Sequence, residues 1–236
     1  MADQRTMLIT GASTGIGRET AHRALEAGYR LILAARREEN LRTLEADLGG
    51  GDDVLVKTCD VGEWDQVQEL VAAGTERFGA PDVVFANAGF GGQNGFMTGT
   101  VAHWRSMVLT NVLGVALTIR ATLPQMLERG TGHYVITSSV VGRVVLAGSF
   151  YSATKHAVTA IGEALRLELR TMHENEQIRV TLIEPGITDT PFFKDVPAEN
   201  PLQPGDLAAG VMFAISQREG VDVNEITIRP TERHTI

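Results

Sequence analysis

Tyr151 and Lys155 are the residues whose types and spacing most directly suggest chemistry. They stand four apart in the segment Tyr151-Ser152-Ala153-Thr154-Lys155, and on a helix this spacing puts both side chains on one face. A free tyrosine has a pKa of about 10 and is a poor base at neutral pH. A nearby ammonium favours the phenolate and lowers that pKa, so the pair could move a proton to or from an alcohol oxygen. The spacing alone occurs by chance in many helices, so this interpretation needs support from other residues.

A glycine-rich turn lies near the start of the chain. Glycine lets the backbone turn tightly and brings N–H groups close to a pyrophosphate, and the N-terminus of the following helix adds a favourable dipole. The spacing here is Gly-x-x-x-Gly-x-Gly, and a simple tight strand-to-helix turn is the alternative interpretation. Its place after the first apolar run favours a dinucleotide-binding turn. The candidate cofactor-binding residues in it are Gly11, Ser13, Thr14, Gly15, Ile16 and Gly17.

Two arginines follow the second apolar run, in the segment Ala35-Arg36-Arg37. About twenty residues after its glycine turn, a dinucleotide-binding fold places either an acidic residue for a ribose hydroxyl or an arginine for a 2′-phosphate. The first carboxylates, Glu38 and Glu39, open the next helix, where they complement its dipole. Arg36 and Arg37 therefore predict NADP as the cofactor through charge-assisted bonds, and a solvated surface pair is the alternative.

The elements that must position these residues follow from the hydrophobic pattern, in which apolar runs alternate with longer amphipathic stretches. Strands are expected at Met7–Thr10, Tyr29–Ala34, Val54–Thr58, Val83–Ala86, His133–Thr137, Arg179–Ile183 and Glu225–Ile228. Helices are expected at Ile16–Ala27, Glu38–Leu48, Trp64–Phe78, Val101–Glu128, Ser152–Met172 and Pro204–Ser216. We expect one doubly wound α/β domain over residues 1–236, with seven mostly parallel strands and helices on both faces. The proline-rich residues 190–204 are expected to form a short substrate loop.

Further motifs occur in an order that one enzyme family shares. Val135-Ile136-Thr137-Ser138-Ser139 is a strand running into hydroxyl residues, Asn87-Ala88-Gly89 follows the fourth strand, and Asn111 lies inside a long helix. Together with the glycine turn, Tyr151 and Lys155, these motifs resemble the short-chain dehydrogenase/reductase family in its classical form, which has a Rossmann sheet. The resemblance covers the chain from Thr10 to about Pro230.

The resemblance implies a role for each catalytic candidate. Tyr151 would be the general acid in reduction and the base in oxidation, while Lys155 would lower its pKa and hold the nicotinamide ribose. Ser138 matches the serine that binds the substrate oxygen, because it precedes Tyr151 by thirteen residues, and Ser139 is the alternative. Asn111 matches the asparagine that positions a water in a proton relay through Lys155.

The resemblance also implies further cofactor contacts. Asp60 and Val61 follow the third strand, where the family contacts the adenine. Ala86 stands where many members carry an additional, mainly structural asparagine. The remaining implied contacts line the cofactor cleft or touch the nicotinamide, and they are Asn87, Ala88, Gly89, Pro185, Gly186, Thr188 and Thr190.

Composition limits the partners and the location. The formal net charge of -8 argues against a nucleic-acid partner, because phosphate backbones need a basic face. The first residues lack the apolar core of a signal peptide, and no uninterrupted apolar stretch approaches the roughly 18 residues of a membrane span, so we expect no membrane partner and a cytoplasmic location. Cys59 is expected to be a buried apolar residue. No metal is expected, since no ligand spacing joins His22, His103, His133, His156, His173 and His234.

These observations predict an NADP-dependent oxidoreductase that transfers hydride between the nicotinamide and a small aldehyde, ketone or hydroxy acid. A nucleotide-sugar epimerase or dehydratase is disfavoured, because too few residues follow Gly186 to build a second domain. The alternative from another class is a catalytically silent NADP-binding sensor or scaffold, although such proteins often lose the tyrosine or the lysine. Short segments near Gly186 and residues 224–231 resemble serine 3-dehydrogenase-like proteins and clavulanate-pathway aldehyde reductases.

Two expectations concern the pocket and the assembly. Arg143 either pairs with a substrate carboxylate or is structural. The helices expected at Val101–Glu128 and Ser152–Met172 carry apolar residues on more than one side, which together with the resemblance predicts a homo-oligomer, a tetramer or a dimer. The candidate substrate-pocket residues are Phe90, Val140, Val141, Arg143, Val145, Phe192 and Phe193.

Overall fold

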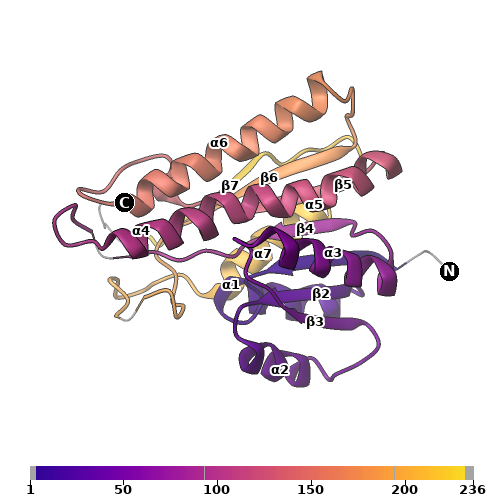
Figure 1. Ribbon diagram of the computed structural model, residues 1–236, viewed down its shortest axis with the longest axis horizontal. Coiled ribbons are helices and arrows are strands. Elements are labelled where there is room, and N and C mark those ends of the chain that lie inside the picture. Colours follow the sequence, from indigo (N-terminus) through magenta and orange to yellow (C-terminus); the bar gives the residue numbers. More distant parts are fainter. Residues whose placement is uncertain (1–3, 93, 194, 232–236) are drawn as a thin grey trace.

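Seven parallel strands form the centre of the protein in a computed structural model that describes residues 4–92, 94–193 and 195–231 (Figure 1). The strands are β1 (Thr6–Thr10), β2 (Arg30–Ala35), β3 (Val54–Thr58), β4 (Val83–Ala86), β5 (Gly132–Thr137), β6 (Ile178–Pro185) and β7 (Glu225–Ile228). Their order across the sheet is β3-β2-β1-β4-β5-β6-β7. The chain therefore winds outward in both directions from the neighbours β1 and β4, and a ligand crevice is expected where that order reverses.

Helices cover both faces of this sheet. One face carries α1 (Gly15–Glu26), α2 (Glu38–Asp47) and α7 (Pro204–Ile215). The other carries α3 (Trp64–Phe78), α5 (Gly114–Arg129) and α6 (Phe150–Thr171), with α4 (Val101–Met107) leading into α5. The expected doubly wound α/β fold, with its seven strands in a single domain, is confirmed.

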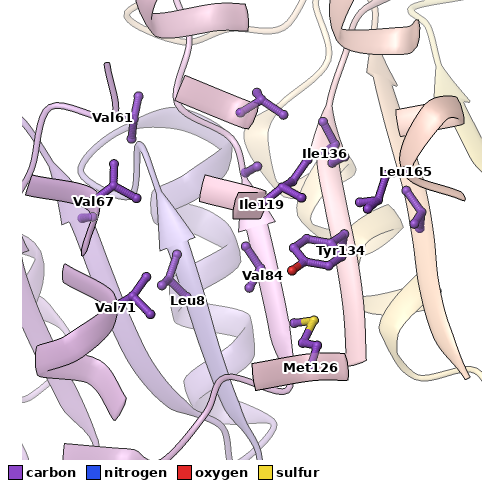
Figure 2. Close-up of a cluster of buried hydrophobic side chains, with 14 of the residues drawn as sticks. Leu8, Val61, Val67, Val71, Val84, Ile119, Met126, Tyr134, Ile136 and Leu165 are labelled. Carbon is purple, nitrogen blue, oxygen red and sulfur yellow. The ribbon is translucent and has the colours of Figure 1, made fainter. Parts of the chain in front are cut away.

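Two apolar cores follow from the alternation of side chains along the strands. On β1, Leu8 packs into the core under α3, α5 and α6, whereas Met7 and Ile9 pack into the core under α1, α2 and α7. Figure 2 shows the first of these cores, with Tyr134 at its centre. The buried Tyr134 hydroxyl lies 2.9 Å from Thr122 Oγ1, so its polar end has a partner inside the apolar layer.

One helical run differs from the regular helix that the pattern predicts. Between α4 and α5, residues Val108–Leu113 form a π-helical stretch, η1, and Asn111 lies within it. The wider turn leaves the overall course of the helix intact and is a local irregularity of the kind often found at functional sites. The hydrophobic period alone does not distinguish this turn from an α-helix.

The same run, Val101–Arg129, contains an 18-residue window with a mean hydropathy of 1.5 and is long and apolar enough to cross a membrane by length and composition. Val115, Ile119 and Met126 are buried against the sheet, so part of this apolar character serves the core. Only 44% of the most apolar window is buried, so much of this helical surface faces outward.

Candidate active site

A cavity of about 1000 Å³ lies at the carboxyl ends of the strands. The loops after β1, β2, β4, β5 and β6 line it, which is where a dinucleotide fold places its ligand. Most predicted site residues line this cavity: Gly11, Ser13, Thr14, Gly15, Ile16, Arg36, Arg37, Val61, Asn87, Ala88, Gly89, Ser138, Tyr151, Lys155, Pro185, Gly186, Thr188 and Thr190. Gly17, Asp60 and Asn111 do not line it. Gly17 packs on Gly11 and Asn111 bonds Phe90, both of which line the cavity, whereas Asp60 bonds Gly62, which does not.

The glycine turn is shaped by backbone that only glycine tolerates. Gly11 and Gly15 have φ values of +64° and +55°, in the left-handed region. A Cβ on Gly17 would fall 2.3 Å from the carbonyl oxygen of Gly11, so the first turn of α1 packs directly on the preceding loop. The first turn of α1 carries no acidic side chain. This turn therefore offers backbone N–H groups and an unopposed helix dipole to an anion, which fits a dinucleotide pyrophosphate.

The tip of β2 supplies the positive charge of the cavity wall. Arg36 and Arg37 both line the cavity, and neither takes part in an ion pair between described residues. The Arg36 guanidinium lies 5.6 Å from the centroid of the Phe90 ring, across the cleft from β2. The residue before Arg36 is Ala35, which is buried and brings no carboxylate. These groups fit an anionic substituent near the tip of β2.

Asn87 joins three strands at the base of the crevice. Its amide nitrogen donates to the carbonyl oxygens of Thr10 (3.3 Å) and Gly11 (3.2 Å), and its amide oxygen accepts from Thr137 Oγ1 (3.0 Å). Asp60 likewise acts within the chain, because its carboxylate accepts from the backbone N–H of Gly62 at 3.0 Å. Asn87 thus holds the cavity floor in shape, and Val61 rather than Asp60 lines the adjoining wall.

Tyr151 and Lys155 meet on the buried face of α6. Ser149 caps this helix by accepting from the N–H of Ser152, which fixes where the helix begins. Lys155 Nζ lies 5.7 Å from the centroid of the Tyr151 ring and donates to the carbonyl oxygen of Thr137 at 2.7 Å. The two side chains therefore lie on one face of α6, as their spacing in the sequence predicts.

Burial governs the protonation of this pair. Burial raises the pKa of Tyr151 above its ordinary value, and a hydrogen bond from Ser139 offsets only part of that rise. Burial also lowers the pKa of Lys155 to about 7. Loss of water sets the direction of the Tyr151 shift, and Lys155 is not among its causes, so the lowering of this pKa by Lys155 stays a prediction. Both shifts favour neutral groups, and a neutral phenol is a proton donor.

Ser138 and Ser139 follow β5, and Ser139, not the expected Ser138, lies toward Tyr151. The Ser138 hydroxyl points away from Tyr151: it donates to the carbonyl oxygen of Lys155 at 3.3 Å and lies 2.7 Å from Thr159 Oγ1. Ser139 is the serine whose side chain lies near enough to the Tyr151 hydroxyl to lower the pKa of that phenol. The choice of Ser138 over Ser139 is corrected on this geometry, since neighbouring residues that leave a strand point to opposite sides.

Asn111 uses its whole side chain to hold the loop after β4. Its amide oxygen accepts from the N–H of Phe90 at 3.0 Å, and its amide nitrogen donates to the Phe90 carbonyl at 2.9 Å and to Thr154 Oγ1 at 3.1 Å. A Cβ on Gly89 would lie 3.2 Å from Asn111 Oδ1 and 3.5 Å from Lys155 Nζ. Glycine at this position keeps the space between Asn111 and Lys155 open.

The segment after β6 closes the opposite wall. Thr188 is buried and donates to the carbonyl oxygen of Gly186 at 3.0 Å. A Cβ on Gly15 would lie 3.0 Å from Thr190 Cγ2, so this segment reaches across to the glycine turn. The loop of residues 190–204 continues from it and brings Phe192 and Phe193 to the cavity, while Lys194 lies outside the described residues.

Of the predicted substrate-pocket residues, Arg143 and Val145 do not line the cavity. Arg143 Nε donates to Glu184 Oε1 at 2.6 Å, and the same guanidinium also pairs with Glu225. Thr227 Oγ1 donates to the other Glu184 oxygen at 2.7 Å. Arg143 is therefore structural, which was one of its two expected roles.

Sequence reasoning missed several lining residues, and most of these lack a chemical signature. Leu146 and Ser149 stand in an irregular loop, and Thr110 sits beside Asn111 on η1.

Cys59 follows β3 and is buried as expected, and burial raises its thiol pKa to about 11. Among the described residues, no group of three or more His, Cys, Asp or Glu could hold a metal, and His234 lies outside that part of the chain.

Comparisons with known proteins agree with this geometry. Residues 5–201 match the family described as short chain dehydrogenase. An uncharacterized oxidoreductase of Staphylococcus saprophyticus is 36% identical over 241 residues, covering 97% of each chain. The closed form of a serine dehydrogenase complexed with NADP+ shares 28% identity and a TM-score of 0.87 over 97% of this chain and 96% of that one. A Burkholderia phymatum short chain dehydrogenase/reductase in complex with NAD shares 27% identity and a TM-score of 0.86, over 95% and 89%. This chain belongs to the short-chain dehydrogenase family of oxidoreductases.

Proposed function

We propose that this protein is an NADP-dependent oxidoreductase that interconverts a small carbonyl compound and its alcohol. The observation that supports this most strongly is the meeting of the Tyr151 phenol, the Ser139 hydroxyl and the Lys155 amine at one cavity wall. A bound nicotinamide cofactor supplies or accepts the hydride. The protein supplies orientation, a proton and stabilisation of the oxygen where charge develops.

The protein's own steps follow from the hydrogen bonds around Tyr151. In reduction, Ser139 and Tyr151 donate to the carbonyl oxygen, and the Tyr151 proton moves to that oxygen as the C–O bond becomes single. The raised Tyr151 pKa keeps the phenol protonated and ready for this direction. Lys155, held by the Thr137 carbonyl, orients the nicotinamide ribose, and Asn111 keeps the facing loop in place.

The cofactor would extend along the carboxyl edge of the sheet. The backbone of the glycine turn would hold its pyrophosphate, and Asn87, Ala88 and Gly89 would line its middle. From β2 to β5 the sheet spans three strand spacings, about 15 Å at roughly 4.8 Å each, which suits an extended dinucleotide. Arg36, with help from Arg37, would bind the 2′-phosphate and give the preference for NADP.

The loop of residues 190–204 would cover the substrate. Phe192, Phe193 and Pro197 line the cavity from this loop, and the Phe192 ring centroid lies 5.3 Å from that of Tyr151. Apolar covering of this kind excludes water from the reacting carbonyl.

A homo-oligomer, most simply a tetramer, would cover the apolar surface that the helices leave exposed. On α6 these residues are Leu167 and, just beyond the helix, Met172, and on the neighbouring run they are Val101, Val108 and Leu113. Exposed apolar side chains on neighbouring helices would be covered by an interface between copies of the chain. Light scattering at micromolar concentration should give two or four times the mass of one chain, and a monomer would contradict this assembly.

The test of the function is turnover by the purified full chain. NADPH oxidation, followed by absorbance, should proceed with members of a panel of aldehydes and ketones. Tyr151→Phe should lower kcat by roughly 10² to 10⁴, the usual share of a general acid, while NADPH binding stays within about threefold. A variant that keeps a tenth of the wild-type rate would remove Tyr151 from the reaction. NADPH binding without turnover of any carbonyl would favour the silent sensor.

A further inference from the structure

The cavity wall beside Tyr151 is built from aromatic rings. The Phe192 ring centroid lies 5.3 Å from that of Tyr151 and 4.9 Å from that of Phe193. Phe192 also presses on the loop after β4, since a Cβ on Gly91 would fall 2.5 Å from Phe192 Cζ. Phe192, from the loop after β6, therefore lies between Tyr151 on α6 and the loop after β4. It is next to the phenol that would donate the proton.

The rest of this end of the cavity is apolar or neutral. Its further lining side chains are Asn94, Val140, Val141, Leu146, Ser149, Pro191 and Pro197, whereas the Phe90 ring lies 5.6 Å from the Arg36 guanidinium. Among the described residues that line the cavity, no side chain is acidic, and the cationic ones are Arg36, Arg37 and Lys155. Gln93 and Lys194 lie outside the part of the chain that the structure describes.

Each of these cations is placed for something other than a substrate carboxylate. Arg36 and Arg37 follow β2, which is three strand spacings, about 15 Å, from β5 and Ser139. Lys155 is buried and donates to the Thr137 carbonyl. Arg143, the one arginine near the serine loop with a candidate substrate role, is engaged by Glu184 and Glu225.

We propose that the substrates are neutral carbonyl compounds bearing an aryl or branched alkyl group, and that carboxylates are rejected. This inference rests on the proposed function. An apolar substituent against Phe192 gains from leaving water, whereas a carboxylate at the same place would lose its hydration without gaining a cation from the described lining residues beside Phe192.

Four related compounds test charge and ring separately: pyruvate, methyl pyruvate, phenylglyoxylate and methyl phenylglyoxylate. In each, the keto carbon receives hydride from NADPH and its oxygen receives a proton through Tyr151, giving the alcohol and NADP+. Each methyl ester should exceed its free acid in kcat/KM by at least a hundredfold. The aryl ester should exceed methyl pyruvate by about tenfold to a hundredfold, the usual range for burying a ring.

Phe192→Ala and Phe213→Ala form a matched pair of variants. Phe213 is an exposed aromatic on α7 and does not line the cavity, so its loss should leave all four rates unchanged. Phe192→Ala should lower kcat/KM for the aryl ester at least tenfold and that for methyl pyruvate less than threefold. Free acids equal to or better than their esters would overturn the proposal while leaving the reductase function intact. NADPH binding without reduction of these four or any wider panel would overturn both.

Discussion

The two serines after β5 offer the sharpest test of the active-site geometry. In the structure, the Ser139 side chain lies near enough to Tyr151 to lower the pKa of its phenol, whereas the Ser138 hydroxyl faces Thr159 at 2.7 Å and the Lys155 carbonyl at 3.3 Å. Ser139→Ala should therefore remove a donor to the substrate oxygen. Losing one such donor costs about 10² to 10³ in kcat, or about 2.7–4 kcal/mol of transition-state stabilisation.

Ser138→Ala should act on stability instead. Ser138 is buried, and its replacement deprives Thr159 of a hydrogen-bond partner, which costs about 1–3 kcal/mol. For a chain of this size that corresponds to a fall in Tm of roughly 2–12 °C. The kcat of this variant should stay within about threefold of wild type, because the hydroxyl lies outside the group that contacts Tyr151.

The assay is kcat for NADPH-dependent reduction of the best carbonyl substrate, paired with Tm for each variant. Ser139 also bonds the Pro185 carbonyl and the N–H of Val141, each at 3.3 Å, so its alanine variant must be measured where it is fully folded. Ser139→Thr keeps a hydroxyl and should recover at least tenfold of the lost rate. A hundredfold loss in Ser138→Ala with near-normal turnover in Ser139→Ala would refute the geometry.

Three further outcomes can be measured on the same protein. Arg36→Ala should lower kcat/KM for NADPH by roughly tenfold to a hundredfold, because a hydrogen bond to a charged group contributes about 1.5–3 kcal/mol. The kcat/KM for NADH should change far less. Equal losses for the two cofactors would argue against a phosphate site at Arg36. Because the Tyr151 pKa is raised, the proton donor persists through neutral pH, so reduction should be nearly flat from pH 7 to about 9. Oxidation needs the phenolate and should rise across that range, and a falling oxidation rate would contradict the assignment. Gly17→Ala puts a Cβ 2.3 Å from the Gly11 carbonyl oxygen and should weaken NADPH binding at least tenfold in a titration. Gly51→Ala, where nothing lies within 4 Å, should bind NADPH normally, and equal effects would mean that the contact is unimportant.

The fold could be predicted because its signals are local. The strands read as continuous apolar runs, and the spacing of Gly11, Gly15 and Gly17 identifies the first turn whatever surrounds it. Tyr151 and Lys155 are likewise four apart on one helix. These features depend only on neighbours in the chain.

What escaped prediction depends on residues far apart. The count from Tyr151 back to Ser138 ignores which way each residue faces as it leaves β5, and one step reverses that direction. The direction of the Tyr151 pKa shift depends on depth of burial, which no local pattern reports. The role of Arg143 was left open because its partner Glu184 lies 41 residues away.

The Arg143–Glu184–Thr227 contact also bears on how the enzyme is made. Glu184 is only 2% exposed, so its carboxylate needs both partners, and one of them, Thr227, belongs to the last strand of the sheet. A ribosome synthesises β7 long after Ser139, Tyr151 and Lys155 have emerged. Until residues 225–228 are made, the serine loop and the end of β6 lack this brace, and we expect the nascent chain to be inactive even when its cofactor half has folded. Chains released from the ribosome before residues 225–228 are made should be inactive, whereas chains released after these residues can pair with β6 should reduce the substrate.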